Sequence, residues 1–96
     1  MPAYIIVDVT VMDPERYAAY RATPSTADEY GGRFVVRGGA TEMLEEGDWF
    51  PDRLAVMEFP DVDSARAWYD SPAYREKRKI RHAAARSTLI LAEGLD

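Results

Sequence analysis

Two carboxylates lie within segments that are otherwise apolar and prone to form strands. Asp8 interrupts the isoleucine- and valine-rich run at residues 4–11, and Glu58 lies near the end of residues 53–59. A carboxylate partly withdrawn from water has a raised pKa unless a cation offsets it, and this suits a general base. If the two strands are parallel neighbours, both carboxylates lie at one level of one sheet face. We therefore take Asp8 and Glu58 as candidate catalytic residues.

Candidate binding residues surround this pair in the expected sheet. Arg37 and Arg53 stand at strand ends, where they could pair with the carboxylates or stabilise an oxyanion. Gly38 and Gly39 have no side chains, so a ligand or a partner subunit could approach the backbone there. The second helical region adds the candidate pocket residues Trp68, Tyr69, Ser71 and Tyr74. A structural interpretation competes with this one, because ion pairs also perturb pKa values and aromatic side chains usually fill cores.

Other catalytic chemistries find little support in the residue types. His82 is the only histidine, and its basic surroundings indicate a surface position. Ser71 precedes it by eleven residues, or about 16 Å along a helix, which is too far for a catalytic serine–histidine pair. There is no cysteine, and one histidine with scattered carboxylates forms no recognisable metal cluster. We predict no metal and no cofactor.

The composition indicates one small domain spanning residues 1–96. The net charge is −5, but six of the twelve basic residues lie between residues 75 and 86. A nucleic-acid patch is one interpretation of that run; a solvated helix face is the one we favour, because no aromatic ladder accompanies it. No apolar run approaches the roughly 20 residues that span a bilayer, and the N-terminus lacks the features of a signal peptide. We expect a cytoplasmic protein that binds neither nucleic acid nor membranes.

Turn and capping residues divide the chain into strands and helices. Predicted strands cover residues 4–11, 33–37, 53–59 and 87–92. Asp13-Pro14 predicts the start of the first helix, and Ser71-Pro72 a restart within the second helical region, which Asp61 or Asp63 caps. At Pro24 the first helix either kinks or gives way to a short helix capped by Thr23. The segment between the second and third strands is either a flap or a long hairpin connection.

The glycine pairs that bracket the second predicted strand have a conformational explanation. Gly31-Gly32 precedes the strand and Gly38-Gly39 follows it. Each pair marks a place where the chain either takes a positive φ or passes close to another backbone.

The order strand, helix, strand, strand, helix, strand predicts an α+β, ferredoxin-like domain with both helical regions on one face of an antiparallel sheet. Right-handed crossovers place the first and third strands in the middle. Both alternating residue sets of the first strand contain large apolar side chains. A helix-free face with this much apolar surface is unusual for a soluble monomer. We therefore expect a homodimer whose two sheets face each other.

Several motifs occur together along nearly the whole chain. They are YGGRFVVRGG (30–39), R-x-x-x-x-E-F ending at Phe59, A-x-x-W-Y-x-S-x-x-Y from Ala65 to Tyr74, Arg81, and the closing Glu93-Gly94. This combination resembles the domain-of-unknown-function 1330 family of the dimeric α/β-barrel superfamily. The resemblance implies a ferredoxin-like fold and a face-to-face dimer, but the family has no established activity. Its superfamily relatives include cofactor-free monooxygenases, muconolactone isomerase-like enzymes, haem-binding chlorite dismutase-like proteins and small-molecule sensing domains.

Three functions are compatible with the sequence. The first is a cofactor-free enzyme in which Glu58 or Asp8 abstracts a proton and Arg37 or Arg53 stabilises the oxyanion. The second is a binding or sensing module that uses the same cleft without chemistry. The third is a structural dimer, which a barrel interior filled by side chains would indicate.

Overall fold

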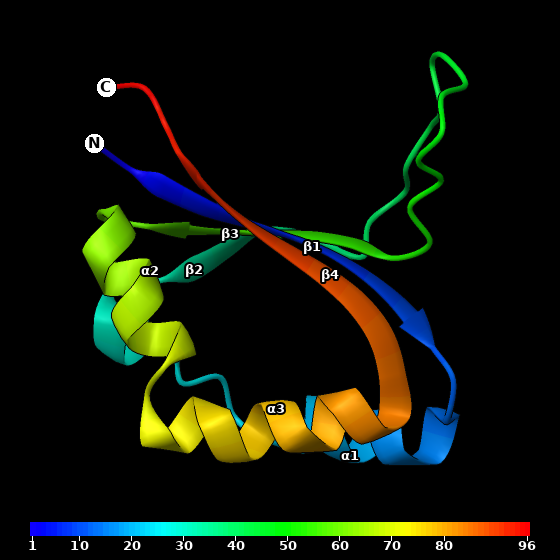
Figure 1. The fold of residues 1–96 in the computed structure, drawn as a ribbon, viewed down its shortest axis with the longest axis horizontal. Coiled ribbons are helices and arrows are strands. Elements are labelled where there is room, and N and C mark those ends of the chain that lie inside the picture. The colour runs from blue at the N-terminus through cyan, green and yellow to red at the C-terminus, as the bar shows by residue number, and fades with distance from the viewer.

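The computed structural model describes residues 1–96, which form one sheet with helices on one side (Figure 1). The strands are β1 (Ala3–Val11), β2 (Arg33–Arg37), β3 (Leu54–Phe59) and β4 (Ala85–Glu93). The helices are α1 (Pro14–Ala22), the 3₁₀ helix η1 (Ala27–Tyr30), α2 (Val62–Tyr69) and α3 (Pro72–Ala84). The sheet order is β2-β3-β1-β4, and every neighbouring pair is antiparallel. The predicted α+β, ferredoxin-like fold is confirmed.

Side-chain caps explain where the helices begin. The Asp13 carboxylate accepts a hydrogen bond from the backbone N–H of Arg16 at 3.2 Å, directly before Pro14. The Ser71 hydroxyl accepts one from the N–H of Tyr74 at 3.3 Å, directly before Pro72. Both predicted starts are confirmed, because each cap satisfies an N–H that the helix itself leaves without a partner.

The region around Pro24 differs from both alternatives that the sequence offered. Helix α1 ends at Ala22, and Thr23 is its C-terminal cap, with its backbone N–H bonded to the carbonyl of Tyr20 at 3.3 Å. The next helical turn begins only at Ala27. Pro24 therefore follows the helix as a terminator, since its ring cannot continue the hydrogen-bond ladder.

The two glycine pairs meet different conformational demands. Gly31 has φ 75° at the end of η1, and Gly38 has φ 66° just after β2, so both adopt the left-handed region. Gly32 is required for space, because a Cβ there would lie 2.4 Å from the Phe59 ring. Gly39 has open space around it and no positive φ. The predicted explanation therefore holds for Gly31 and Gly38 through their positive φ, whereas Gly32 is close to a side chain and not to a backbone, and Gly39 meets neither condition.

The core lies between the sheet and the helices. Alternate residues of β1 (Ile5, Val7 and Val9) are buried on this helix-covered face, together with Met57, Phe59, Trp68 and Tyr74. The opposite face carries Tyr4 and Ile6, which are only half-buried, and Ile90, which is 46% exposed. We call this opposite side the helix-free face; no helix covers it, and its apolar side chains are partly exposed within one chain.

The connection between β2 and β3 is a long hairpin loop at residues 38–53 that projects away from the sheet on the side opposite the helices (Figure 1). Residues 38–50 are exposed, among them Leu44 at 86% and Phe50 at 64%. Of the two sequence interpretations, the hairpin connection is the one observed within the single chain. None of the helices is both long and apolar enough to traverse a lipid bilayer.

Candidate functional site

The two candidate catalytic carboxylates are not at one level of the sheet. Strands β1 and β3 are antiparallel, with Tyr4 opposite Glu58 and Asp8 opposite Leu54. Glu58 and Asp8 therefore share the helix-free face but lie near opposite ends of the strand pair, about 13 Å apart at ~3.3 Å per residue. The parallel arrangement that would have brought them together is wrong, because the split βαβ topology makes these two central strands antiparallel.

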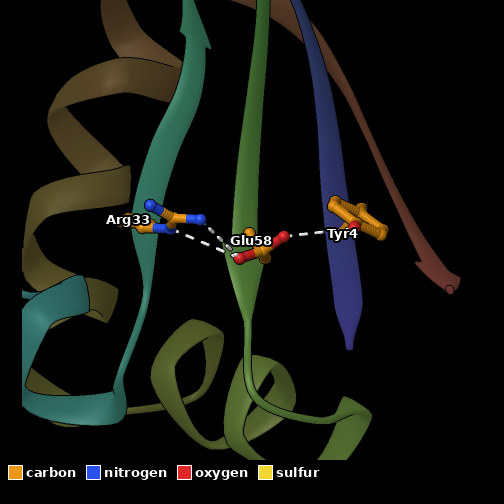
Figure 2. Close-up of polar contacts among 3 residues, drawn as sticks. All are labelled: Tyr4, Arg33 and Glu58. Atoms are coloured by element: carbon orange, nitrogen blue, oxygen red, sulfur yellow. Dashed lines mark hydrogen bonds and ion pairs between the residues drawn. The ribbon is translucent and has the colours of Figure 1, made fainter. Parts of the chain in front are cut away.

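Glu58 is held in a polar cluster with neighbours on both adjacent strands. Arg33 of β2 donates to Glu58 Oε1 from Nη2 at 3.0 Å and from Nε at 3.3 Å, and the Tyr4 hydroxyl of β1 donates to Oε2 at 3.1 Å (Figure 2). Hydrogen bonds from Arg33 and then Tyr4 hold the pKa of Glu58 below its ordinary value. The partner is Arg33, and neither Arg37 nor Arg53 contacts Glu58. A carboxylate whose pKa is lowered in this way is a weaker base.

Asp8 anchors the projecting loop. Its Oδ2 accepts from the indole Nε1 of Trp49 at 3.0 Å, and its Oδ1 accepts from the backbone N–H of Asp52 at 2.9 Å. Burial on its own raises the pKa of Asp8, but these hydrogen bonds and one from the backbone of Arg53 lower it below its ordinary value. The contacts of Asp8 are those of a structural acceptor at the base of a loop.

A cavity of about 210 Å³ lies on the other side of the sheet, between the strands and the helices. Its floor is apolar and comes from the sheet, and its walls are aromatic, hydroxyl-bearing or cationic side chains. The lining consists of Val7, Val9, Tyr17, Tyr20, Arg21, Thr23, Ser25, Thr26, Phe34, Arg37, Gly38, Arg53, Ala55, Met57, Trp68, Tyr74, Lys77, Arg81 and Leu89. Concave sites with an apolar surface and a few convergent polar groups are the usual form of small-molecule sites.

The cavity contains five cations and no carboxylate. Arg21, Arg37 and Arg53 are exposed and mark its opening, while Lys77 is half-buried and Arg81 is buried. Four of them stack on aromatic rings of the same cavity: the Arg37 guanidinium lies 4.4 Å from the Phe34 ring centre, and the others pair as Arg53 with Tyr17, Lys77 with Tyr20 and Arg81 with Tyr74. Burial and then the charge of Arg37 lower the pKa of Lys77.

A hydrogen-bonded chain of three side chains crosses the cavity wall. Arg81 Nη1 donates to the Tyr74 hydroxyl at 2.9 Å, and the Tyr74 and Tyr20 hydroxyl oxygens are 3.1 Å apart. Burial is the main cause that raises the pKa of Tyr74, so this phenol stays protonated at neutral pH. The chain joins α3 to α1 and brings polar groups to an otherwise apolar interior.

The structure brings together five of the candidate binding residues and separates the others. Arg37, Gly38, Arg53, Trp68 and Tyr74 line the cavity. Gly39 and Ser71 do not, and the Ser71 hydroxyl is occupied as a helix cap that also donates to the carbonyl of Trp68 at 2.7 Å. Tyr69 lines a different, smaller cavity of about 180 Å³ between α2 and the sheet.

The cavity is also lined by residues that the sequence did not single out as binding residues, among them Tyr20, Phe34, Lys77 and Arg81. A signal for Arg81 was present, because Tyr74 and Arg81 are seven residues apart, or about two helical turns, so they share one face of α3. The surrounding run of basic residues concealed this signal, since its other members are exposed or half-buried.

Comparisons with known proteins agree on the fold and supply no activity for this chain. A family model described as "Domain of unknown function (DUF1330)" matches residues 2–95. No curated protein matches the sequence. The crystal structure of RPA0582, a protein of unknown function from Rhodopseudomonas palustris, is similar with a TM-score of 0.76 and 28% identity, over 99% of this chain and 83% of that one.

Two further crystal structures share the fold. Methylated RPA0582 gives a TM-score of 0.73 and 29% identity, over 99% of this chain and 82% of that one. SnoaB, a cofactor-independent oxygenase from Streptomyces nogalater, gives a TM-score of 0.61 and 17% identity, over 99% of this chain and 94% of that one. At that identity the likeness to SnoaB shows the fold alone.

Proposed function

The chain belongs to the DUF1330 family, for which no activity is described, and we propose from the geometry of its cavity that it binds a small organic molecule between the sheet and the helices. One observation supports this proposal above the others: an open cavity of about 210 Å³ remains between the sheet and the helices, with aromatic and cationic side chains around it. A purely structural domain is expected to fill such a space with side chains, because protein interiors are close-packed. The volume lies below the roughly 300–1,000 Å³ of pockets for drug-sized ligands, which favours a smaller molecule.

The lining of the cavity favours ligand binding without acid–base catalysis by a carboxylate. Glu58 and Asp8 lie on the helix-free face, so neither reaches a ligand in the cavity. No other carboxylate and no histidine lines the space. The tyrosine hydroxyls and the cations can orient a ligand and stabilise negative charge on it.

Oxygenase chemistry is the second candidate, and the observation that favours it is the shared fold with SnoaB over 99% of this chain. Oxygen consumption in the presence of a bound ligand distinguishes this candidate from binding alone. An oxygenase consumes oxygen in proportion to the ligand supplied and returns a modified product. A binding protein returns the ligand unchanged.

We also propose that the functional unit is a homodimer that buries the helix-free face. Ile90 is 46% exposed and Val36 is 38% exposed on this face, beside half-buried Ile6 and Val56. A second copy with the same surface would remove these side chains from water. The projecting loop, in which Leu44 and Phe50 are exposed, lies on the same side of the sheet (Figure 1).

The two tryptophans provide a direct test of ligand binding. Trp68 is 4% exposed and lines the cavity, whereas Trp49 is 50% exposed on the projecting loop. A Trp49→Phe protein therefore reports on the cavity alone, and a Trp68→Phe protein is the matched control that reports on the loop alone. Small aromatic compounds should change the emission of Trp68 in a saturable way and leave that of Trp49 unchanged. A response of Trp49 alone would place the ligand outside the cavity and contradict the proposal.

A further inference from the structure

The cavity concentrates positive charge in an acidic protein. The chain has a net charge of −5, yet all five titratable side chains of the cavity other than tyrosine are cations. The ion pairs of the structure join the N-terminus to Asp96, Arg16 to Asp13, Arg33 to Glu58 and Lys79 to Glu76. None of them involves a cavity cation. No cavity cation is therefore in an ion pair within the chain, although Lys77 Nζ donates to the backbone carbonyls of Thr23 and Pro24 at 3.3 and 2.9 Å.

Arg81 is the most deeply buried of these cations. Its side chain is 3% exposed, and no carboxylate pairs with it. Nη1 donates to the Tyr74 hydroxyl, Nη2 lies 3.2 Å from the His82 Nε2, and the buried Nε has no partner. A guanidinium does not lose its proton in a protein, so it cannot avoid the cost of burial by becoming neutral. A buried charge of this kind is normally paired with an opposite charge.

The Arg81 guanidinium and the hydroxyls of Tyr74 and Tyr20 can be oriented so that one hydrogen-bond donor remains for an anion. Because Arg81 Nη1 donates to the Tyr74 oxygen, the Tyr74 hydroxyl hydrogen is free to point at the Tyr20 oxygen, 3.1 Å away. The hydrogen of the Tyr20 hydroxyl then remains for a ligand. A chain of hydrogen bonds that starts at a cation is polarised, so its terminal donor is strengthened toward an acceptor with negative charge.

The apolar part of the lining favours an anion that also carries an apolar body. Val7, Val9, Met57 and Leu89 form an apolar floor, and Phe34 and Trp68 add aromatic walls. A hydrated inorganic ion gains nothing from such a surface, whereas a flat apolar body buries area against it.

We infer that the ligand of this cavity is a small organic acid, with an aromatic or other flat apolar body on the sheet floor and a carboxylate directed at Arg81 and Tyr20. This inference rests on the proposed function and specifies its ligand class. The exposed cations Arg21, Arg37 and Arg53 at the opening attract the acid and retain it. The bound carboxylate supplies the negative charge that Arg81 lacks in the free protein.

The test compares acids with neutral amides of nearly the same shape. Benzoate is paired with benzamide, 2-naphthoate with 2-naphthamide, and inorganic phosphate serves as an anion without an apolar body. Binding is measured by NMR titration of the ¹⁵N-labelled full chain. The acid of a pair should bind at least about tenfold more tightly than its amide, which is about 1.4 kcal/mol, and phosphate should bind more weakly than 2-naphthoate.

Variants that each remove one positive charge test whether the cavity cations cause the preference for an acid over its amide. Arg81→Gln should bring the acid and the amide to similar affinity. Because removal of a buried guanidinium could unfold the chain, Arg37→Gln at the exposed opening is the second variant, and it should weaken acid binding without changing amide binding. Arg75→Gln is the matched control, since Arg75 is exposed on α3, the helix that carries Arg81, and does not line the cavity. This variant should behave as the wild type.

The outcomes separate this inference from the proposed function. If an amide binds in the cavity as tightly as its acid, or if both Arg81→Gln and Arg37→Gln retain the wild-type preference, the ligand is not an acid held by these cations, although the cavity still binds small molecules. If phosphate binds as tightly as 2-naphthoate, the apolar body is not recognised and the inference also fails. If no acid and no amide binds at concentrations up to about 10 mM, the proposed function itself is contradicted.

Discussion

Arg81 Nη1 donates a 2.9 Å hydrogen bond to the hydroxyl of Tyr74, and both residues are buried beside the cavity between the sheet and the helices. The two residues occupy one face of the helix about two turns apart. Their contact places a positive charge inside a domain whose interior is otherwise apolar or hydroxyl-bearing. The binding properties that we propose depend on this arrangement, and so does part of the stability of the free protein.

Tyr74→Phe should destabilise the protein by about 1–3 kcal/mol, because it leaves a buried guanidinium N–H without an acceptor. Tyr69→Phe is the matched control: Tyr69 is half-buried on α2, and its hydroxyl makes no hydrogen bond within the chain. The control should change stability by less than about 0.5 kcal/mol. Urea denaturation followed by circular dichroism measures both. Equal stability of the two variants would show that the Arg81–Tyr74 bond is energetically unimportant.

Glu58→Gln should leave ligand binding in the cavity unchanged, because Glu58 lies on the opposite face of the sheet. Its effect should instead appear in the pH dependence of stability. Arg33 and Tyr4 lower the pKa of folded Glu58 below the ordinary 4.5, so the folded protein releases this proton more readily than the unfolded chain. The stabilisation is therefore complete above pH 4.5 and is lost as the pH falls through the lower folded pKa.

Thermal melts of the wild type and Glu58→Gln across this acidic range measure the effect. The wild type should lose more of its melting temperature on acidification than the variant does. Loss of ligand binding in Glu58→Gln, with the melting temperature unchanged, would instead support the catalytic role that the sequence suggested for Glu58.

Gly32→Ala should destabilise the protein by about 1–3 kcal/mol through overpacking. Its Cβ would lie 2.4 Å from the ring of Phe59, a buried residue of the core. Gly39→Ala is the matched control, since nothing lies within 4 Å of the added atom and its φ is not positive. It should be neutral or slightly stabilising, because alanine restricts the unfolded chain. A Gly32→Ala protein as stable as Gly39→Ala would contradict the packing described around Phe59.

Ile90→Arg should dissociate the homodimer that we propose. Ile90 faces Ile6 across β1 and β4 on the helix-free face, so the substitution places a charge in the centre of the proposed interface. Ile80→Arg introduces the same charge on α3, where Ile80 is 38% exposed, and should leave the dimer intact. Analytical ultracentrifugation at micromolar concentration compares them. A wild type that sediments as a folded monomer would contradict the proposed homodimer.

Local sequence signals were sufficient to predict the fold. Asp13-Pro14 and Ser71-Pro72 start helices through short-range hydrogen bonds that the neighbouring residues determine by themselves. The alternation of apolar residues in β1 identified a strand with two different faces. The end of α1 before Pro24 was harder to predict, because whether a proline kinks a helix or ends it depends on packing outside that helix.

The candidate site could be predicted only in part. Arg37, Arg53, Trp68 and Tyr74 were identified as binding residues, and they do line one cavity. Asp8 and Glu58 were misplaced because strand direction and sheet face decide their position, and these follow from the topology of the whole domain. Arg81 was overlooked because its burial depends on how α3 packs in the whole fold, while the other basic residues of α3 are exposed or half-buried.

A crystal structure of the protein grown with 2-naphthoate decides whether the cavity holds an organic acid. We expect ligand density between the sheet and the helices, with the carboxylate beside Arg81 and Tyr20 and the rings against Leu89 and Phe34. Density on the helix-free face beside Glu58, or a cavity closed by side chains with no ligand inside it, would show that the cavity is not the binding site.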